Sequence, residues 1–195
     1  MIKALFLDRD GIINKMIKKL DPFTKKIIDD SPFKVSELKM VPESKELVKK
    51  AKEKGYKVII ITNQPSIVKG QFSLKDYEDI TTEICKYLEL KRGDVFECLH
   101  KEGITLECNC RKPKPGLFLM AKGIHDIDLT NSIMIGDSWK DIKAAKDIGI
   151  GKTIFIKRKE SKEQVGNADA ERKMKELNLI PTHFCDNLKE TITLI

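Results

Sequence analysis

Short apolar runs alternate with segments of helical periodicity along most of this chain. The runs at 4–7, 57–61, 132–135 and 152–156 have the length and branched apolar composition of buried strands. Between them, apolar residues recur three and four positions apart, which is the spacing of a helix that packs one face against a core. Such alternation with short connections is typical of an α/β fold with a doubly wound parallel sheet and helices on both faces. We predict that fold class.

Capping residues mark where the predicted helices begin and end. Pro42 opens a helix that runs to about Lys54, and Gly55 follows at the position where a helix commonly ends. Ser73 is placed as an N-cap, because Asp76 three residues later completes a capping box. Further helices are expected at 117–124, at 140–148 and from about 187, with short strands at 95–98 and 183–185.

The length of 195 residues leaves room for one domain with a small insertion. We therefore expect a single domain over residues 1–195, without a large cap domain. Residues 12–41 contain Pro22, Pro32 and several lysines without clear periodicity, which predicts an irregular loop or a substrate flap over the site.

The formal charge of +7 is compatible with an anionic partner, either a phosphorylated metabolite or a nucleic acid. The lysines are dispersed along predicted helix faces, as in 45–54, and aromatic residues make up only 6% of the chain. Nucleic-acid binding favours a continuous basic stripe with stacking aromatics, so we expect a small metabolite as partner. The chain shows neither a secretory signal nor a run long enough to span a bilayer, which predicts a cytoplasmic protein with no membrane partner.

The sequence Asp8-Arg9-Asp10-Gly11 directly follows the first apolar run. Ligands of open parallel sheets bind beyond the carboxyl ends of the strands. Two carboxylates there can hold a metal and share nucleophilic and proton-transfer roles. Asp-x-Asp alone is a weak pattern, since it recurs at 126–128, where we interpret it as a solvated turn between a helix and a strand. The functional interpretation therefore depends on further motifs.

Two more clusters supply groups that bind phosphate. Thr62-Asn63-Gln64 follows the second apolar run, where a hydroxyl and backbone N–H groups can donate to phosphoryl oxygens; an ordinary turn is the alternative. Arg111-Lys112-Pro113-Lys114 carries three cations on a backbone that proline restricts. This segment fits either a fixed positive loop that neutralises a phosphate or a solvated basic loop.

A last acidic pair repeats the opening pattern. Asp137 follows the apolar run at 132–135, and Asp141 stands four residues later at the start of a predicted helix. Carboxylates from neighbouring strand ends, Asp8 and Asp137, make an oxygen-rich site suited to Mg²⁺. An N-cap role for Asp137 or Ser138 is the structural alternative.

The loop at 98–110 holds a complete tetrahedral ligand set for structural Zn²⁺, three thiolates and one imidazole, from Cys98, His100, Cys108 and Cys110. Since Arg111 and Lys112 come next, bound zinc would fix the loop that presents these cations. The other two cysteines, Cys85 and Cys185, stand in apolar patterns and are expected to be buried structural thiols.

In this order the four clusters resemble the motifs of the haloacid dehalogenase superfamily of phosphotransferases, and the resemblance covers about residues 1–158. It implies a Rossmann-like fold and a Mg²⁺-dependent phosphatase that works through an aspartyl-phosphate. By this resemblance Asp8 is the nucleophile and Asp10 the general acid and base. Mg²⁺ is held by Asp8, Asp137 and the main-chain carbonyl of Asp10. Asp141 orients either the metal ligands or Lys112.

The same resemblance implies roles for the other polar residues of the motifs. Thr62 and Lys112 bind the oxygens of the transferring phosphoryl group. Arg111 contacts that group or a second phosphate on the substrate. Asn63 and Gln64 line the site and bind substrate.

Together with the Cys/His loop, these motifs are similar to the branch that contains D-glycero-D-manno-heptose-1,7-bisphosphate 7-phosphatase and the histidinol-phosphatase domain. The branch implies a sugar bisphosphate substrate of heptose biosynthesis and a monomer. Histidinol-phosphate phosphatase, polynucleotide 3'-phosphatase and a noncatalytic zinc-stabilised binding protein are the alternatives. Ile12, Ser66 and Ser138 depart from the pattern of the branch and leave the choice of substrate open.

Overall fold

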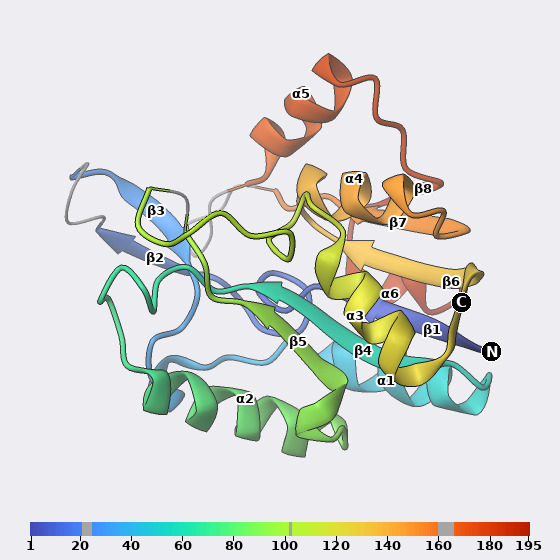
Figure 1. The fold of residues 1–195 in the computed structure, drawn as a ribbon, viewed down its shortest axis with the longest axis horizontal. Helices are drawn as coiled ribbons and strands as arrows, with labels where there is room; N and C mark the ends of the chain where they lie inside the picture. The colour runs from blue at the N-terminus through green and yellow to red at the C-terminus, as the bar shows by residue number, and fades with distance from the viewer. Residues whose placement is uncertain (21–24, 102, 160–165) are drawn as a thin grey trace.

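Six parallel strands form one sheet in the order β5-β4-β1-β6-β7-β8 (Figure 1). The computed structural model describes residues 1–20, 25–101, 103–159 and 166–195. The strands are β1 (Ile2–Leu7), β4 (Lys57–Asn63), β5 (Val95–Cys98), β6 (Ile127–Gly136), β7 (Lys152–Ile156) and β8 (His183–Cys185). Because the chain adds strands on one side of β1 and then on the other, the topological switch point lies at the carboxyl end of β1. The predicted doubly wound sheet is confirmed.

Helices cover both faces of this sheet, as Figure 1 shows. On one face lie α1 (Pro42–Glu53), α2 (Leu74–Leu88) and α6 (Leu188–Thr191); on the other lie α3 (Gly116–His125) and α4 (Trp139–Asp147). Successive residues of β1 serve opposite faces, since Leu5 and Leu7 pack into the first layer and Ala4 and Phe6 into the second. Burial on both sides explains why the strands read as continuous apolar runs.

The predicted helix boundaries agree closely with the structure. Ser73 caps α2 through a capping box with Asp76. Gly55 follows α1 with a positive φ of 78°, a conformation that glycine adopts without steric cost. No helix in the described parts of the chain is long and apolar enough to cross a membrane.

The insertion at 12–41 is more regular than expected. Strands β2 (Ile17–Leu20) and β3 (Ile27–Asp30) pair as an antiparallel hairpin, followed by a 3-10 turn, η1 (Val35–Glu37). Lys19 joins β2 to the segment that follows β3, because its Nζ pairs with Glu37 at 2.9 Å and lies 3.1 Å from the ring centroid of Phe33. Pro22 lies outside the described residues. Each strand has only four residues, with two lysines in β2 and two aspartates in β3, so their sequence carries little periodic signal.

Two further elements differ from the sequence-based boundaries. Strand β6 begins at Ile127, which pairs with Ile2 at the amino end of β1. The second Asp-x-Asp, at 126–128, therefore lies at the amino ends of the strands, whereas Asp8 follows the carboxyl end of β1. A helix that the sequence did not predict, α5 (Ala168–Glu176), follows β7. It is strongly charged and buries only Met174, which leaves too narrow an apolar stripe for periodicity to reveal.

Candidate active site

Three neighbouring strands end around one cavity of about 520 Å³. Leu7 of β1 lies level with Ile60 of β4 and with Ile135 of β6, so the residues just beyond them converge. The predicted site residues that line this cavity are Asp8, Asp10, Thr62, Asn63, Arg111, Lys112, Asp137 and Asp141. The parallel register therefore assembles motifs that are up to 133 positions apart in the chain, from Asp8 to Asp141.

The carboxylate group, defined here as Asp8, Asp137 and Asp141, brings one oxygen from each residue within 4.8 Å of the others. Burial, reinforced by the negative charge of Asp141, raises the pKa of Asp8 to about 8. Burial likewise raises the pKa of Asp137 to about 6, although the neighbouring Arg158 acts in the opposite direction. Crowded carboxylates favour a nearby cation, and hard oxygen donors are what Mg²⁺ prefers. The donor set fits that ion.

Two glycines permit this crowding. Gly11 has a φ of +92°, and a Cβ there would lie 2.1 Å from Oδ2 of Asp137. A Cβ on Gly136 would lie 2.5 Å from the side chain of Asp141. Both contacts are closer than non-bonded atoms allow, so packing requires glycine at both positions, and the positive φ favours it at Gly11 as well.

Lys112 is the cation built into the site. Its side chain is 3% exposed, and its Nζ lies 2.9 Å from Asp8 Oδ1 and 2.6 Å from Asp141 Oδ1. It also donates to the carbonyl of Ile61 at 2.7 Å. Burial alone would lower its pKa, but the carboxylates of Asp141 and Asp8 raise the pKa of Lys112 above its ordinary value. Lys112 therefore stays charged beside Asp8.

Asp141 and Ser138 divide the roles that the sequence left open. Ser138 is the N-cap of α4, and Oδ2 of Asp141 accepts the Ser138 N–H at 3.0 Å. The other oxygen of Asp141 faces Lys112. Asp141 therefore contacts Lys112 directly and also belongs to the carboxylate group, so both alternatives for its role stay predictions; Asp137 lines the cavity, and Ser138 caps the helix.

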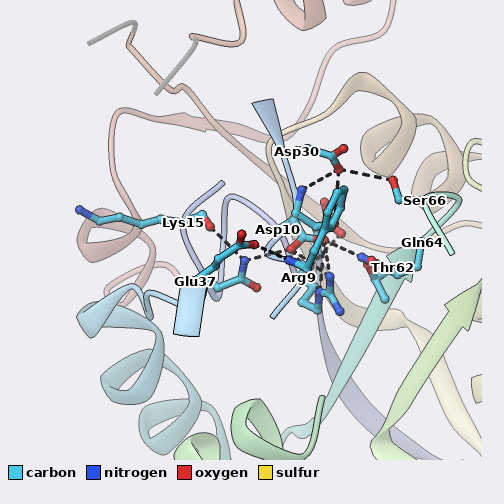
Figure 2. Close-up of polar contacts among 12 residues, drawn as sticks. Arg9, Asp10, Lys15, Asp30, Glu37, Thr62, Gln64 and Ser66 are labelled. Atoms are coloured by element: carbon cyan, nitrogen blue, oxygen red, sulfur yellow. Dashed lines mark hydrogen bonds and ion pairs between the residues drawn. The ribbon is translucent and has the colours of Figure 1, made fainter. Parts of the chain in front are cut away.

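Asp10 is held by donors from three residues (Figure 2). Arg9 donates from Nε and Nη2 to both carboxylate oxygens of Asp10, at 3.0–3.2 Å. Asn14 donates from Nδ2 at 2.9 Å, and Gln64 donates from Nε2 at 2.6 Å. The side chain of Asp10 is thus fixed apart from the carboxylate group, and its main-chain carbonyl as a metal ligand stays a prediction.

Asn63 and Gln64 lie differently from the expected substrate-binding pair. Gln64 is 1% exposed and is not part of the cavity wall that the described residues form. Asn63 lies on that wall, but its amide pairs with the backbone of Lys112, with both contacts at 3.0 Å. The hydrogen-bonding capacity of both side chains is directed largely at the protein.

Arg158 is a site residue that the sequence did not reveal. Its Nε lies 2.5 Å from Oδ2 of Asp137, and its Nη1 lies 2.8 Å from Oδ2 of Asp29 in the hairpin. Asn167 supports the same region by donating to the carbonyl of Asp137 at 2.7 Å. Arg158 stands between two lysines after β7, a setting that reads as a solvated basic run. Its role depends on contacts 21 and 129 positions away, which no local pattern marks.

The Cys/His group consists of Cys98, His100, Cys108 and Cys110, whose ligand atoms all lie within 4.8 Å of one another. The sulfurs of Cys98 and Cys108 are 3.8 Å apart, and Nδ1 of His100 lies 3.5 Å from Cys98 Sγ and 3.2 Å from Cys110 Sγ. A tetrahedral ion with metal–sulfur bonds of about 2.3 Å separates its sulfur ligands by about 3.8 Å. The spacing of the donors therefore fits zinc.

None of the five cysteines forms a disulfide, and Cys85 and Cys185 are buried.

The Cys/His group is followed directly in the sequence by the basic segment. Arg111 follows Cys110 directly and donates from Nη1 to the carbonyl of His100 at 3.2 Å. The fold of the Cys/His loop thus sets where Arg111 and the next residue, Lys112, enter the cavity.

Comparisons with known proteins agree with this geometry. Residues 2–149 match the haloacid dehalogenase-like hydrolase family, and residues 109–191 match a related HAD-hydrolase-like family. The chain is 33% identical over 189 residues to a D-glycero-alpha-D-manno-heptose-1,7-bisphosphate 7-phosphatase from Campylobacter jejuni, covering 93% of this chain and 95% of that protein. It is 37% identical over 158 residues to a D-glycero-beta-D-manno-heptose-1,7-bisphosphate 7-phosphatase from Helicobacter pylori, covering 79% of this chain and 83% of that protein.

A solved structure shares the whole fold. The crystal structure of D,D-heptose 1,7-bisphosphate phosphatase from B. bronchiseptica, complexed with magnesium and phosphate, superposes with a TM-score of 0.75. The alignment covers 99% of this chain and 97% of that one at 22% identity. The similarity extends through β7, α5 and β8, so it includes the part of the chain that follows the last sequence motif.

Proposed function

This chain belongs to the haloacid dehalogenase-like hydrolase family, and we propose that it removes the 7-phosphate of D-glycero-D-manno-heptose 1,7-bisphosphate in a Mg²⁺-dependent reaction. Family membership and relatives named as phosphatases make it a phosphatase. The observation that carries the proposal is the convergence of Asp8, Lys112 and Asp137 at the switch point of the sheet. Relatives of 30–37% identity named for this substrate support the choice of sugar.

The proposed reaction has two steps at phosphorus. In the first, a carboxylate oxygen of Asp8 forms a bond to phosphorus while the bond to the sugar oxygen breaks, and Asp10 gives that oxygen a proton. In the second, Asp10 takes a proton from water as the water oxygen attacks the phosphorus of the aspartyl-phosphate. Asp8 is released as a carboxylate, and inorganic phosphate leaves.

Charge on the phosphoryl oxygens is met by this chain's own donors. Lys112 stays protonated between Asp8 and Asp141, so it presents a full positive charge next to the nucleophile. Thr62 lines the cavity and offers a hydroxyl to the same group. These donors are in place before substrate arrives, which lowers the cost of reorganisation during transfer.

The metal assignments follow from the donor sets. Asp8, Asp137 and the main-chain carbonyl of Asp10 would hold Mg²⁺, which when bound supplies positive charge between two anions that must meet. The Cys/His group would hold Zn²⁺ as a structural ion, because four protein ligands complete its shell.

A second anionic group on the substrate has a place in the same cavity. Arg111 and Lys140 both line it, on the side of the Cys/His loop. Burial and the charge of Arg111 lower the pKa of Lys140, which indicates cations crowded together with little compensation. A bisphosphate meets that demand better than a monophosphate such as histidinol phosphate.

Two of the three departures from the branch pattern reach the cavity. Ser66 and Ser138 line it, whereas Ile12 is buried in the core. Any effect of these departures on substrate choice is therefore expected from the two serines. We propose a monomer located in the cytoplasm. None of the five cysteines forms a disulfide, which suits a reducing compartment. Light scattering after size-exclusion chromatography tests the expected mass of 22.3 kDa.

A substrate panel tests the function. It contains the alpha and beta anomers of the heptose bisphosphate, histidinol phosphate and a 3'-phosphorylated oligonucleotide, because the relatives include both anomeric types. We expect the largest kcat/KM with one heptose bisphosphate anomer. A larger value for another substrate would replace the proposed sugar, and no Mg²⁺-dependent phosphate release from any of them would favour the zinc-stabilised binding protein.

A further inference from the structure

The Thr62-Asn63-Gln64 segment sends its three side chains in different directions. It leaves the end of β4, where Thr62 and Asn63 line the cavity and Gln64 turns behind it. Figure 2 shows the Gln64 and Thr62 side chains together on one side of Asp10. Each of the two amide side chains pairs with a different catalytic residue, Asn63 with Lys112 and Gln64 with Asp10.

The orientation of the Gln64 amide follows from its neighbours. Its Nε2 lies 2.6 Å from Asp10 Oδ2 and 2.9 Å from Thr62 Oγ1. The amide nitrogen of Gln64, and not its oxygen, faces both atoms and donates to Asp10. The same nitrogen then donates to the Thr62 hydroxyl, which leaves the Thr62 proton free to point into the cavity. Gln64 thereby makes Thr62 a donor towards the phosphoryl oxygens.

Asp10 is fixed from its other side by Arg9. The Arg9 side chain is 1% exposed, and its guanidinium carbon lies 5.5 Å from the ring centroid of Tyr77 on α2. Arg9 therefore ties Asp10 to the helix layer, while Gln64 ties Asp10 to β4. With Gln64 removed, Asp10 keeps its ion pair but loses the contact that relates it to Thr62.

Asn63 acts on the other catalytic side chain in a similar way. Its Nδ2 donates to the carbonyl of Lys112, and its Oδ1 accepts the Lys112 N–H, both at 3.0 Å. This pair closes a ring across 49 positions of sequence. It fixes the backbone from which Lys112 reaches Asp8.

We propose that Asn63 and Gln64 are positioning residues, with Gln64 setting Asp10 and Thr62 and Asn63 setting Lys112. The inference rests on the proposed function, since it assigns the two residues through their catalytic partners. It separates two kinds of defect. Misplacing the general acid slows the departure of an alcohol much more than that of p-nitrophenolate, which leaves without a proton. Misplacing Lys112 weakens charge stabilisation for both leaving groups.

The test compares Gln64→Met with Asn63→Leu. For each variant the first step is followed by rapid quench, with the best alkyl phosphate of the substrate panel and with p-nitrophenyl phosphate. For Gln64→Met we expect the loss on the alkyl phosphate to exceed the loss on the aryl phosphate by about tenfold or more. For Asn63→Leu we expect equal losses on both. Gln71→Met, the same change at a glutamine away from the cavity wall, is expected to match the parent protein.

Several outcomes would overturn the proposal. These are equal losses on the two leaving groups for Gln64→Met, or a raised KM for the sugar phosphate with an unchanged first step, which would make Gln64 a substrate-binding residue. If Gln64→Met does not fold, Gln64→Asn, which is one methylene shorter, must give the same split between leaving groups. A parent protein that hydrolyses no phosphomonoester would defeat the proposed function instead, so the two failures are distinguishable.

Discussion

The carboxylate group and the Cys/His group are both clusters of metal-ligating side chains, yet the fold holds them in opposite ways. Asp8 and Asp137 follow two adjacent strands, and Asp141 stands in the first turn of α4, so buried secondary structure sets all three positions. In the Cys/His group only Cys98 belongs to a strand, and His100 is exposed. The first cluster is organised by the sheet, whereas the second is organised mainly by its own ligands.

Because the two clusters are held differently, substitutions in them should have different effects on activity and on local stability. Packed strands keep the carboxylates close together against their mutual repulsion, and Lys112 offsets part of that repulsion. Ile104 and Leu106 of the Cys/His loop are exposed, so the free energy of binding the proposed Zn²⁺ would contribute directly to the folding of the loop. We therefore expect changes in the first cluster to abolish chemistry with the fold intact. Changes in the second should loosen a loop and affect chemistry indirectly.

The largest expected effect is that of Asp8→Asn. It removes the proposed nucleophile and should lower kcat by on the order of 10⁴, because the covalent intermediate cannot form without the attacking carboxylate oxygen. The unfolding temperature should stay the same or rise, since one charge leaves a crowded buried group. Steady-state kinetics and thermal unfolding check both statements. Retention of more than about a few per cent of activity would contradict the assignment of the nucleophile.

Lys112→Met tests whether the carboxylate group depends on its internal cation. The change leaves Asp141 buried without its charge partner, which is expected to destabilise the protein by about 3–5 kcal/mol. Activity should be lost as well. The control is Lys114→Met in the same segment, where the pair with Glu107 is exposed and contributes little to stability. Equal destabilisation of the two variants in urea unfolding would argue against the ion pairs of Lys112.

Loss of Cys108, a proposed zinc ligand, tests the other half of the comparison. In Cys108→Ser, measured with excess Mg²⁺, we expect faster hydrogen exchange across 98–110 and unchanged exchange in β1 and β6. Activity should fall roughly 10-fold to 100-fold, as for losses of supporting residues around a metal. Cys185→Ser, at a buried cysteine remote from the loop, should leave exchange in the loop unchanged. Exchange that accelerates throughout the sheet would show that the loop is not a separate unit of stability.

Ser138→Ala gives the smallest expected effect. Loss of the N-cap of α4 should cost about 1 kcal/mol of folding free energy. Because Asp141 belongs to the same capping box and faces Lys112, kcat should also fall slightly. Ser73→Ala removes an equivalent cap from α2, away from the cavity, and should cost similar stability without any change in kcat. Identical kcat values for the two variants would show that the cap of α4 does not affect catalysis.

Much of the fold was predictable because strand and helix periodicity is a local property. The central strands are buried on both faces and therefore read as apolar runs, and the caps at Ser73 and Gly55 lie within a few residues of the ends they mark. Weak elements escaped for the converse reason. The hairpin β2–β3 and helix α5 bury little apolar surface, so their sequences resemble those of loops.

The chain's motifs determined the sheet, the strand-end acids, the basic segment and the Cys/His ligands, since each is written in neighbouring residues. Only the tertiary structure decided which partner each side chain meets. Gln64 faces Asp10 across 54 positions, and Arg158 reaches Asp29 across 129. A hydrogen bond or ion pair depends on distance in space, and that distance is set by strand order and register after the whole sheet has formed.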